Sequence, residues 1–180
     1  MKPNSLQELY VEQLQDLYNA EQQIIEALPE MIDAAASNDL KNALTEHLEI
    51  TKTQATRLDQ IFNAMGEEAK GEKCKGMKGV IDEGSDLIDD IDDSDVRDAA
   101  IIAAAQRVEH YEMAGYGTAR TYATLLGEEQ ASRLLQQTLD EEKEADQTLT
   151  ALASRINIEA GGKAVESETG QQPPKRKRIA

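Results

Sequence analysis

The sequence predicts an all-α protein in which four long helices form one bundle. Helix breakers are rare: no glycine precedes Gly66, and Pro29 is the only proline between Asn4 and Gln172. Alanine, leucine, glutamate and glutamine, which favour helices, are frequent along the chain. Apolar residues recur every three or four positions in four long segments, which is the spacing of an amphipathic helix.

The first long helix is expected over residues 5–36. Ser5 and Glu8 match the S-x-x-E capping box, which satisfies free N–H groups in the first turn of a helix. Pro29 should kink this helix without ending it, because the apolar stripe continues in phase beyond the proline. After a tight Ser-Asn-Asp turn, the second long helix is expected over residues 40–65.

A long connection follows the second helix. Residues 66–75 are polar and glycine-rich, and residues 77–91 have the apolar spacing of a short helix. The third long helix is expected over residues 94–126, where Gly127 ends it. The fourth long helix then continues to residue 160.

These connection lengths predict the topology of the bundle. Tight turns make the first and second helices, and the third and fourth, antiparallel hairpins. The connection of about thirty residues between the hairpins can run the length of the bundle, which makes the second and third helices parallel, as in ferritin-like four-helix bundles. We therefore expect one ferritin-like domain over residues 1–160. Residues 161–180 lose the apolar periodicity and are expected to form a disordered tail.

Composition excludes several classes of function. The net charge is −16, with 35 acidic and 19 basic residues, so the folded body is not expected to bind nucleic acid. The longest purely apolar run, residues 99–105, is far too short to cross a membrane, and no hydrophobic leader opens the chain. The single cysteine, Cys74, excludes an intramolecular disulfide and a cysteine-rich metal site. A cytoplasmic protein is expected.

Acidic residues interrupt the apolar stripes of three helices. Glu21 occupies a core position of the first helix, and Glu109 and Glu112 share one face of the third. In the fourth helix, Glu142 is in the core phase and Asp146 lies one turn beyond it. Counted from the turns at about 1.5 Å per residue, these acids lie at the same height within about one helical turn.

A group of acids at one height in a core needs compensation. Burying an ionised carboxylate alone costs several kcal/mol, although a single glutamate at a helix seam can extend its head to water. Because acids from three helices lie at the same height, a cation shared among them is favoured instead. Grouped carboxylate oxygens suit iron or manganese in a carboxylate-bridged dinuclear site.

The second helix contributes less obvious ligands. At the height of Glu21 it offers Thr51 and Gln54, and His47 lies on the same seam about two turns lower, nearer Glu109. A seam histidine is either a hydrogen-bonded core residue or a metal ligand, and both readings stay open for His47. His110 lies two positions from Glu112 and therefore points away, toward the surface or a subunit interface.

Several stretches resemble the YciE/YciF-type bacterial stress proteins, which are ferritin-like and related to rubrerythrin. They are LYNAE at 17–21, HLE at 47–49, MKGVIDEG at 77–84, VRDAA at 96–100, VEHYE at 108–112 and TLDEEK at 138–143. The resemblance covers residues 5–155 in order. It implies a homodimeric ferritin-like bundle that is linked to stress responses and holds a di-metal site.

The resemblance also implies roles for individual residues. Glu21 matches the metal ligand of the first helix, Glu112 that of the third, and Glu142 the first residue of the Glu-x-x-His motif of the fourth. The histidine of that motif falls on Ala145, with Asp146 beside it. The second helix does not contain the corresponding Glu-x-x-His motif.

Two functions follow as alternatives. The first is a metal-binding oxidoreductase, or its remnant, in which iron or manganese binds O₂ or peroxide; Glu21 and Glu112 bridge the metals, Glu142 is terminal, and Glu109 and Asp146 complete the ligand set. The second is a non-catalytic helical dimer that acts by association under stress. A calcium sensor is a weaker third alternative: the aspartates of residues 86–95 lack the glycine and glutamate of an EF-hand loop and are expected to cap the next helix.

Overall fold

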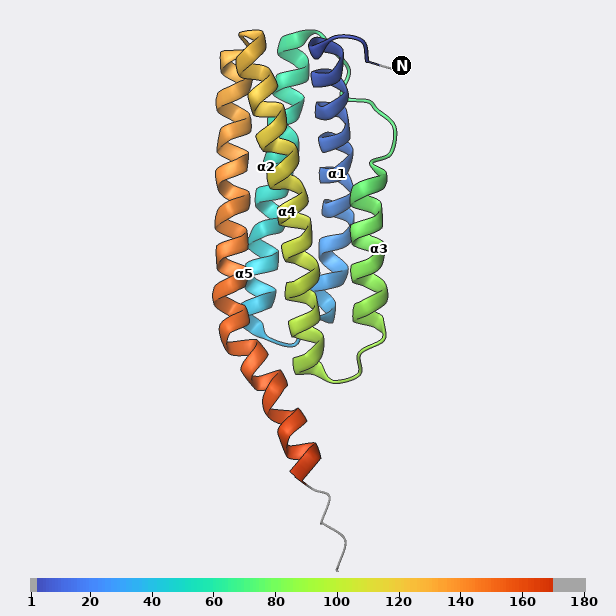
Figure 1. Ribbon diagram of the computed structural model, residues 1–180, viewed down its shortest axis with the longest axis vertical. Helices are drawn as coiled ribbons and strands as arrows, with labels where there is room; N and C mark the ends of the chain where they lie inside the picture. The colour runs from blue at the N-terminus through green and yellow to red at the C-terminus, as the bar shows by residue number, and fades with distance from the viewer. Residues whose placement is uncertain (1–2, 170–180) are drawn as a thin grey trace, which may run out of the picture.

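The computed structural model describes residues 3–169, with side chains as far as residue 162. Within this range the chain forms helices and no strands: α1 (Leu6–Ala34), α2 (Asn38–Met65), α3 (Lys75–Asp89), α4 (Ser94–Leu126) and α5 (Glu129–Thr169). In Figure 1, α1 descends, α2 rises, α3 descends on the outside, α4 rises and α5 descends. The predicted all-α class is confirmed.

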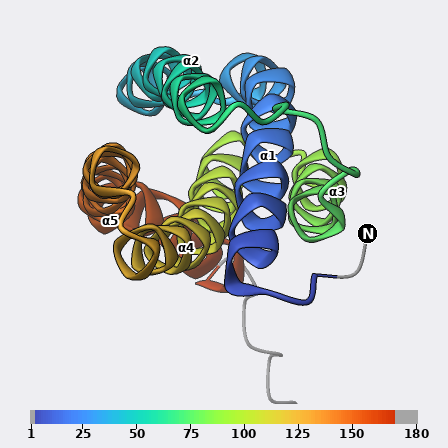
Figure 2. The same cartoon turned by 90° about the horizontal axis from the view of Figure 1, so that it is seen from above.

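The four long helices form a closed ring. α1 contacts α2, α2 contacts α5, α5 contacts α4, and α4 contacts α1. Viewed from above, α3 lies outside this ring, packed against α4 and α1 (Figure 2). The crossover from α2 to α4 runs back along the bundle, so these two helices are parallel, as the connection lengths predicted.

The crossover helix α3 is fixed by close contacts. The thiol of Cys74 accepts the N–H of Met77 as the N-cap, and its sulfur lies 3.0 Å from the Tyr111 hydroxyl. Burial raises the pKa of this thiol, so Cys74 is held protonated rather than as a reactive thiolate. At Gly84, an added Cβ would lie only 2.9 Å from that of Ala104, so glycine is what lets α3 approach α4 this closely.

The helix ends follow the predicted capping residues with small shifts. The Ser5 hydroxyl accepts the N–H of Glu8 at 3.1 Å, but the Glu8 carboxylate accepts from Asn4 at 2.6 Å instead of returning to Ser5. α4 begins after Asp93, whose side chain accepts the first free N–H groups. It ends at Gly127, whose φ of 80° lies in the left-handed region that glycine tolerates.

α5 is longer than the sequence predicted. The expected disordered tail began at residue 161, but the helix continues to Thr169; residues 170–180 of that tail lie outside the described part of the chain. Loss of apolar spacing removes packing but does not stop a helix. Each further residue adds one backbone hydrogen bond, and after Gly162 the segment to Thr169 holds helix-compatible residues and no proline.

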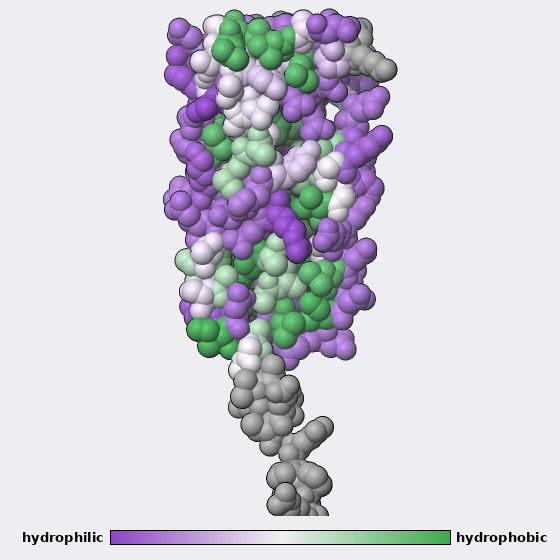
Figure 3. Space-filling view, viewed as in Figure 1, coloured by the Kyte–Doolittle hydropathy of each residue, from purple (hydrophilic) through white to green (hydrophobic). Residues whose placement is uncertain are grey.

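The surface agrees with the composition. The face in Figure 3 is mostly hydrophilic, as a net charge of −16 leads one to expect, with smaller hydrophobic groups near its upper and lower ends. No helix within residues 3–169 combines the length and apolar character that crossing a bilayer requires.

The apolar core is divided into two clusters along the bundle axis. One lies toward the turn between α1 and α2 and includes Ile24, Leu44 and Ile101. The other lies toward the turn between α4 and α5 and includes Leu14 and Phe62. In every long helix, buried polar side chains lie at the boundary between the two clusters. We call this boundary the acid layer; it contains Glu21, His47, Glu109, Glu112 and Glu142.

The turn between α1 and α2 is held by the first turn of α4. Both carboxylate oxygens of the buried Asp98 accept backbone N–H bonds, from Ala36 and Ser37, at 2.7 Å each. Arg97 donates to the carbonyl of Ala34 at 3.1 Å. These contacts bring the start of α4 level with the end of α1, which fixes the relative height of side chains further along both helices.

Replacing Asp98 by alanine should lower the free energy of unfolding by about 3 kcal/mol, because two N–H groups lose a charged acceptor. Asp92→Ala, at an exposed acid just before α4, is the matched control and should change stability by less than about 0.5 kcal/mol. Urea unfolding followed by circular dichroism measures both. Equal stability of the two variants would contradict the role given to Asp98.

Candidate metal centre

The acid layer brings together side chains from all four long helices. α1 supplies Glu21, α2 supplies His47, α4 supplies Glu109 and Glu112, and α5 supplies Glu142. None of them is more than 7% exposed. The structure therefore gathers four of the five acids that phase and height had selected from the sequence.

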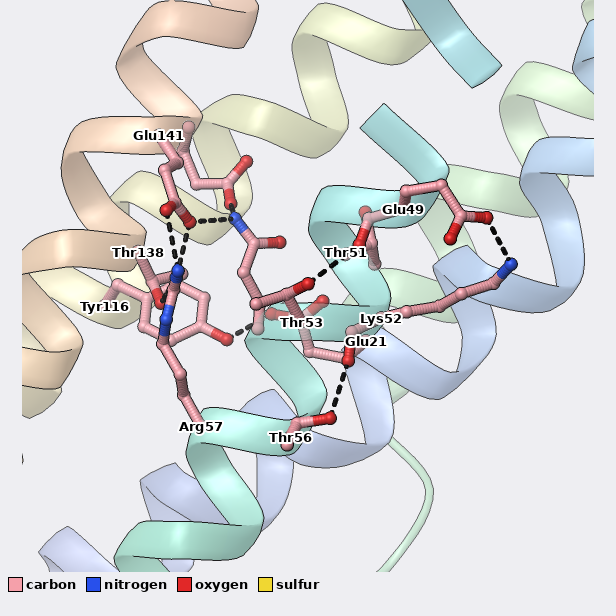
Figure 4. Close-up of polar contacts among 12 residues, drawn as sticks. Glu21, Glu49, Thr51, Lys52, Thr53, Thr56, Arg57, Tyr116, Thr138 and Glu141 are labelled. Carbon is pink, nitrogen blue, oxygen red and sulfur yellow. Dashed lines mark hydrogen bonds and ion pairs between the residues drawn. The ribbon is translucent and has the colours of Figure 1, made fainter. Parts of the chain in front are cut away.

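Most of this group lies within the reach of one metal centre. One potential ligand atom from each of His47, Glu109, Glu112 and Glu142 lies within 4.8 Å of the other three. Glu21 borders them closely enough for its charge to raise the pKa of Glu109 and Glu112. The Tyr116 hydroxyl donates to the Glu21 carboxylate, and Figure 4 shows the two side chains directed toward each other.

Asp146, the fifth predicted ligand, is not in the acid layer. Its carboxylate accepts a hydrogen bond from Gln106 at 3.0 Å and lies 3.5 Å from the imidazole of His110. Four residues after Glu142, Asp146 is rotated by about 40° around α5, which turns its short side chain toward α4. His110 is exposed, as predicted.

His47 is the ligand candidate that the sequence left open. Its Nε2 lies 3.4 Å from a Glu109 oxygen, and neither ring nitrogen makes a hydrogen bond. Burial lowers the pKa of His47 to about 4. The imidazole is therefore neutral near pH 7, which is the form that binds metals.

Residues next to the acid layer hold one of its carboxylates, that of Glu142, in place. Gln54, from α2, donates to Glu142 and also to Glu141. Arg57 pairs with Glu141 at 2.7 Å and donates to Thr138 at 3.2 Å, contacts that Figure 4 displays between α2 and α5. This network holds Glu142 on the α2 side. Sequence reasoning placed Gln54 at the right height but did not find Arg57 or Glu141.

The remaining candidates from the sequence have structural roles. Thr51 is buried, but its hydroxyl donates to the backbone carbonyl of His47 at 2.8 Å and so faces its own helix. The aspartate-rich segment supplies the N-cap of α4 through Asp93.

The electrostatics of the acid layer disfavour four negative charges. Burial raises the pKa of Glu21, Glu109, Glu112 and Glu142, and the charges of neighbouring carboxylates raise it further. Without a cation the layer therefore retains protons at a pH where exposed glutamates are ionised. Tyr116 is affected in the same way: burial, then the charge of Glu21, raises the pKa of its hydroxyl.

The acid layer also holds polar atoms without partners. They are Glu21 Oε2, Glu109 Oε2, both carboxylate oxygens of Glu112, Glu142 Oε2 and both nitrogens of His47. A buried polar atom left unpaired costs about 1–3 kcal/mol. Carboxylate oxygens and a neutral imidazole are a donor set that suits iron or manganese. The residues present therefore fit a metal centre.

Fold and site together define a class of protein, a helical bundle with a buried carboxylate–histidine group in its core. The sequence matches the family described as a domain of unknown function (DUF892) over residues 5–160, and the chain belongs to that family. Protein YciF of Escherichia coli (strain K12) is 41% identical over 166 residues, which cover 91% of this chain and 100% of that protein. The resemblance found in the sequence is confirmed.

Solved structures agree with this membership. The crystal structure of the Escherichia coli stress protein YciF matches with a TM-score of 0.84 and 40% identity, over 87% of this chain and 99% of that chain. YcfI from Rhodopseudomonas palustris matches with a TM-score of 0.80 and 44% identity, over 82% of this chain and 94% of that one. A Xanthomonas campestris protein at 21% identity, with a TM-score of 0.71, shares the fold.

The raised carboxyl pKa values predict that the metal-free protein loses stability as pH rises. Each such glutamate stabilises the fold fully below its unfolded pKa, and this stability is lost as pH rises through the folded pKa. His47 acts in the opposite direction, but only between its ordinary pKa of 6.5 and about 4. Above pH 6.5, the unfolding free energy of protein kept in chelator should therefore fall with pH.

Glu112→Gln tests the source of this slope. Removing one titrating group should flatten the fall by as much as about 1 kcal/mol per pH unit, measured by urea unfolding between pH 6.5 and 9. Glu26→Gln, at an exposed position of α1, is the control and should keep the wild-type slope. A wild-type stability that is flat or rising over this range would refute the electrostatic description of the layer.

Proposed function

We propose that this protein binds iron or manganese in the acid layer, as a carboxylate-bridged pair, and that the loaded site reacts with O₂ or peroxide during stress. The metal would supply the electrons and the open coordination position for that chemistry. The role in stress is extended to this chain from its relative, the Escherichia coli stress protein YciF.

One observation carries the proposal: the unpartnered atoms of the layer converge. Neither oxygen of Glu112 accepts a hydrogen bond from a donor group of the described residues, and one of them lies within 4.8 Å of ligand atoms of Glu142 and His47. A carboxylate with two free oxygens among other ligands is suited to bridging two ions. A purely structural core would be expected to supply these atoms with hydrogen-bond donors, whereas here Glu21 pairs with Glu112, and Glu109 with Glu142, only when one carboxyl group of the pair keeps a proton.

The surrounding residues perform distinct tasks in this proposal. Glu21, Glu112 and Glu142 would hold the metal together with Glu109, and His47 would take the place predicted for Asp146. Tyr116 orients Glu21, and Gln54 orients Glu142, so both carboxylates are held before any metal arrives. The apolar clusters on either side of the layer limit the entry of water along the bundle axis.

The two halves of the site are unequal. α5 supplies Glu142 to the layer, whereas α2 has Thr51 at the height of Glu21, and the hydroxyl of Thr51 donates to the backbone of its own helix. One metal position is therefore poorer in carboxylates, and we expect weaker binding there. A homodimer, implied by the family resemblance, remains part of the proposal.

Elemental analysis tests the proposal directly. Protein produced with iron and manganese, and purified without chelator, should retain about one to two metal ions per chain. Glu21→Ala and Glu112→Ala should each lose most of that metal, because each removes a bridging carboxylate. Glu26→Ala, an exposed glutamate on the same helix as Glu21, should retain it. Metal-free wild-type protein of normal stability would instead support a non-catalytic helical dimer.

A further inference from the structure

A cavity of about 410 Å³ opens between α2 and α5 and reaches the acid layer. Its lining includes the buried His47 and Glu109 and, nearer the surface, Glu46, Glu144 and Ala145. A water molecule occupies about 30 Å³ in the liquid, so the cavity has room for a hydrated ion. It connects the outside of the bundle to two members of the candidate metal centre.

The inner end of this cavity carries unpartnered polar atoms. Both nitrogens of His47 and Oε2 of Glu109 make no hydrogen bond, and the two residues are 7% and 2% exposed. Buried polar groups normally have a hydrogen-bond partner, so unpartnered polar atoms at the wall of a cavity indicate a binding site for a polar or charged ligand. One carboxylate and one neutral imidazole form a binding step for a divalent cation.

A small side chain leaves this cavity open. Ala145 lies three residues after Glu142, at the position where the family resemblance places a histidine. Its methyl group is half-buried and lines the cavity. A larger side chain at this position would occupy space between the surface and His47.

The outer part of the cavity is acidic. Glu46 and Glu144 are exposed, and neither makes an ion pair or a side-chain hydrogen bond with any residue that the structure describes. The neighbouring Glu141 is already paired with Arg57. Two uncompensated carboxylates at an opening raise the local concentration of cations and the rate at which they enter.

We propose that the cavity between α2 and α5 is the entry route for the metal. Glu46 and Glu144 collect a divalent cation at the surface, and His47 with Glu109 receives it at the inner end before it passes to Glu112 and the rest of the layer. This inference rests on the proposed function, because it needs the acid layer to bind metal.

Uptake of Co²⁺ tests the route with a spectroscopic probe. Ala145→Leu should slow the appearance of Co²⁺ absorbance in stopped flow by at least about tenfold and leave the final stoichiometry unchanged. Ala151→Leu, at an exposed position of the same helix, should load at the wild-type rate. The double variant Glu46→Gln/Glu144→Gln should load about tenfold more slowly at low ionic strength, and added salt should reduce this difference.

A neutral reagent tests the opening without any metal. Diethyl pyrocarbonate modifies neutral imidazole, and in a His110→Gln background His47 is the only histidine. Mass spectrometry should show modification of His47 slowed at least about tenfold by Ala145→Leu. Ala151→Leu and the double glutamate variant should show no such slowing, because the reagent carries no charge. Unchanged circular dichroism would show that all variants are folded.

The outcomes separate the two proposals. Wild-type protein that binds no Co²⁺ overturns the proposed function and the entry route together. Wild-type protein that loads normally, with Ala145→Leu and Ala151→Leu loading at equal rates, overturns the route alone. Equal modification of His47 in these two variants also overturns it.

Discussion

The burial of four carboxylates at one height in an apolar core is the constraint on which the rest of the structure depends. Desolvation and mutual repulsion oppose their ionisation, and the described residues contribute only a few donors, chiefly Tyr116 and Gln54. An arrangement of this kind is stable with a cation or with retained protons. It separates the two apolar clusters and interrupts the core of the bundle with a buried carboxylate–histidine group.

The acids lie together because the helices are aligned along the bundle axis, and contacts at the turns fix this alignment. Asp98 and Arg97 fix the start of α4 to the end of α1, so Glu21 and Glu112, each about four turns away, arrive at one level. The crossover makes this possible because it lets α4 begin at that end of the bundle. A stabilising contact far from the layer thus determines the geometry within it.

Much of this arrangement could be predicted from the sequence. Helix periodicity and connection lengths gave the bundle, and phase with height selected Glu21, Glu109, Glu112 and Glu142. Asp146 does not join them, because a rotation of about 40° and the donor Gln106 decide its direction, and neither is visible in a pattern of spacing. The same holds for the contacts of Asp98, which depend on tertiary structure. The length of α5 differed because loss of amphipathic spacing does not by itself end a helix.

The central claim is that the acid layer holds metal, and anomalous X-ray scattering from crystals of protein loaded with iron or manganese tests it most directly. Data collected at the absorption edge of the metal should show a peak bordered by Glu112, Glu142 and His47, with a second, weaker peak toward Thr51. Asp146 should be absent from the coordination shell. An empty layer in loaded crystals, with the four glutamates bonded to one another through protons, would contradict the account.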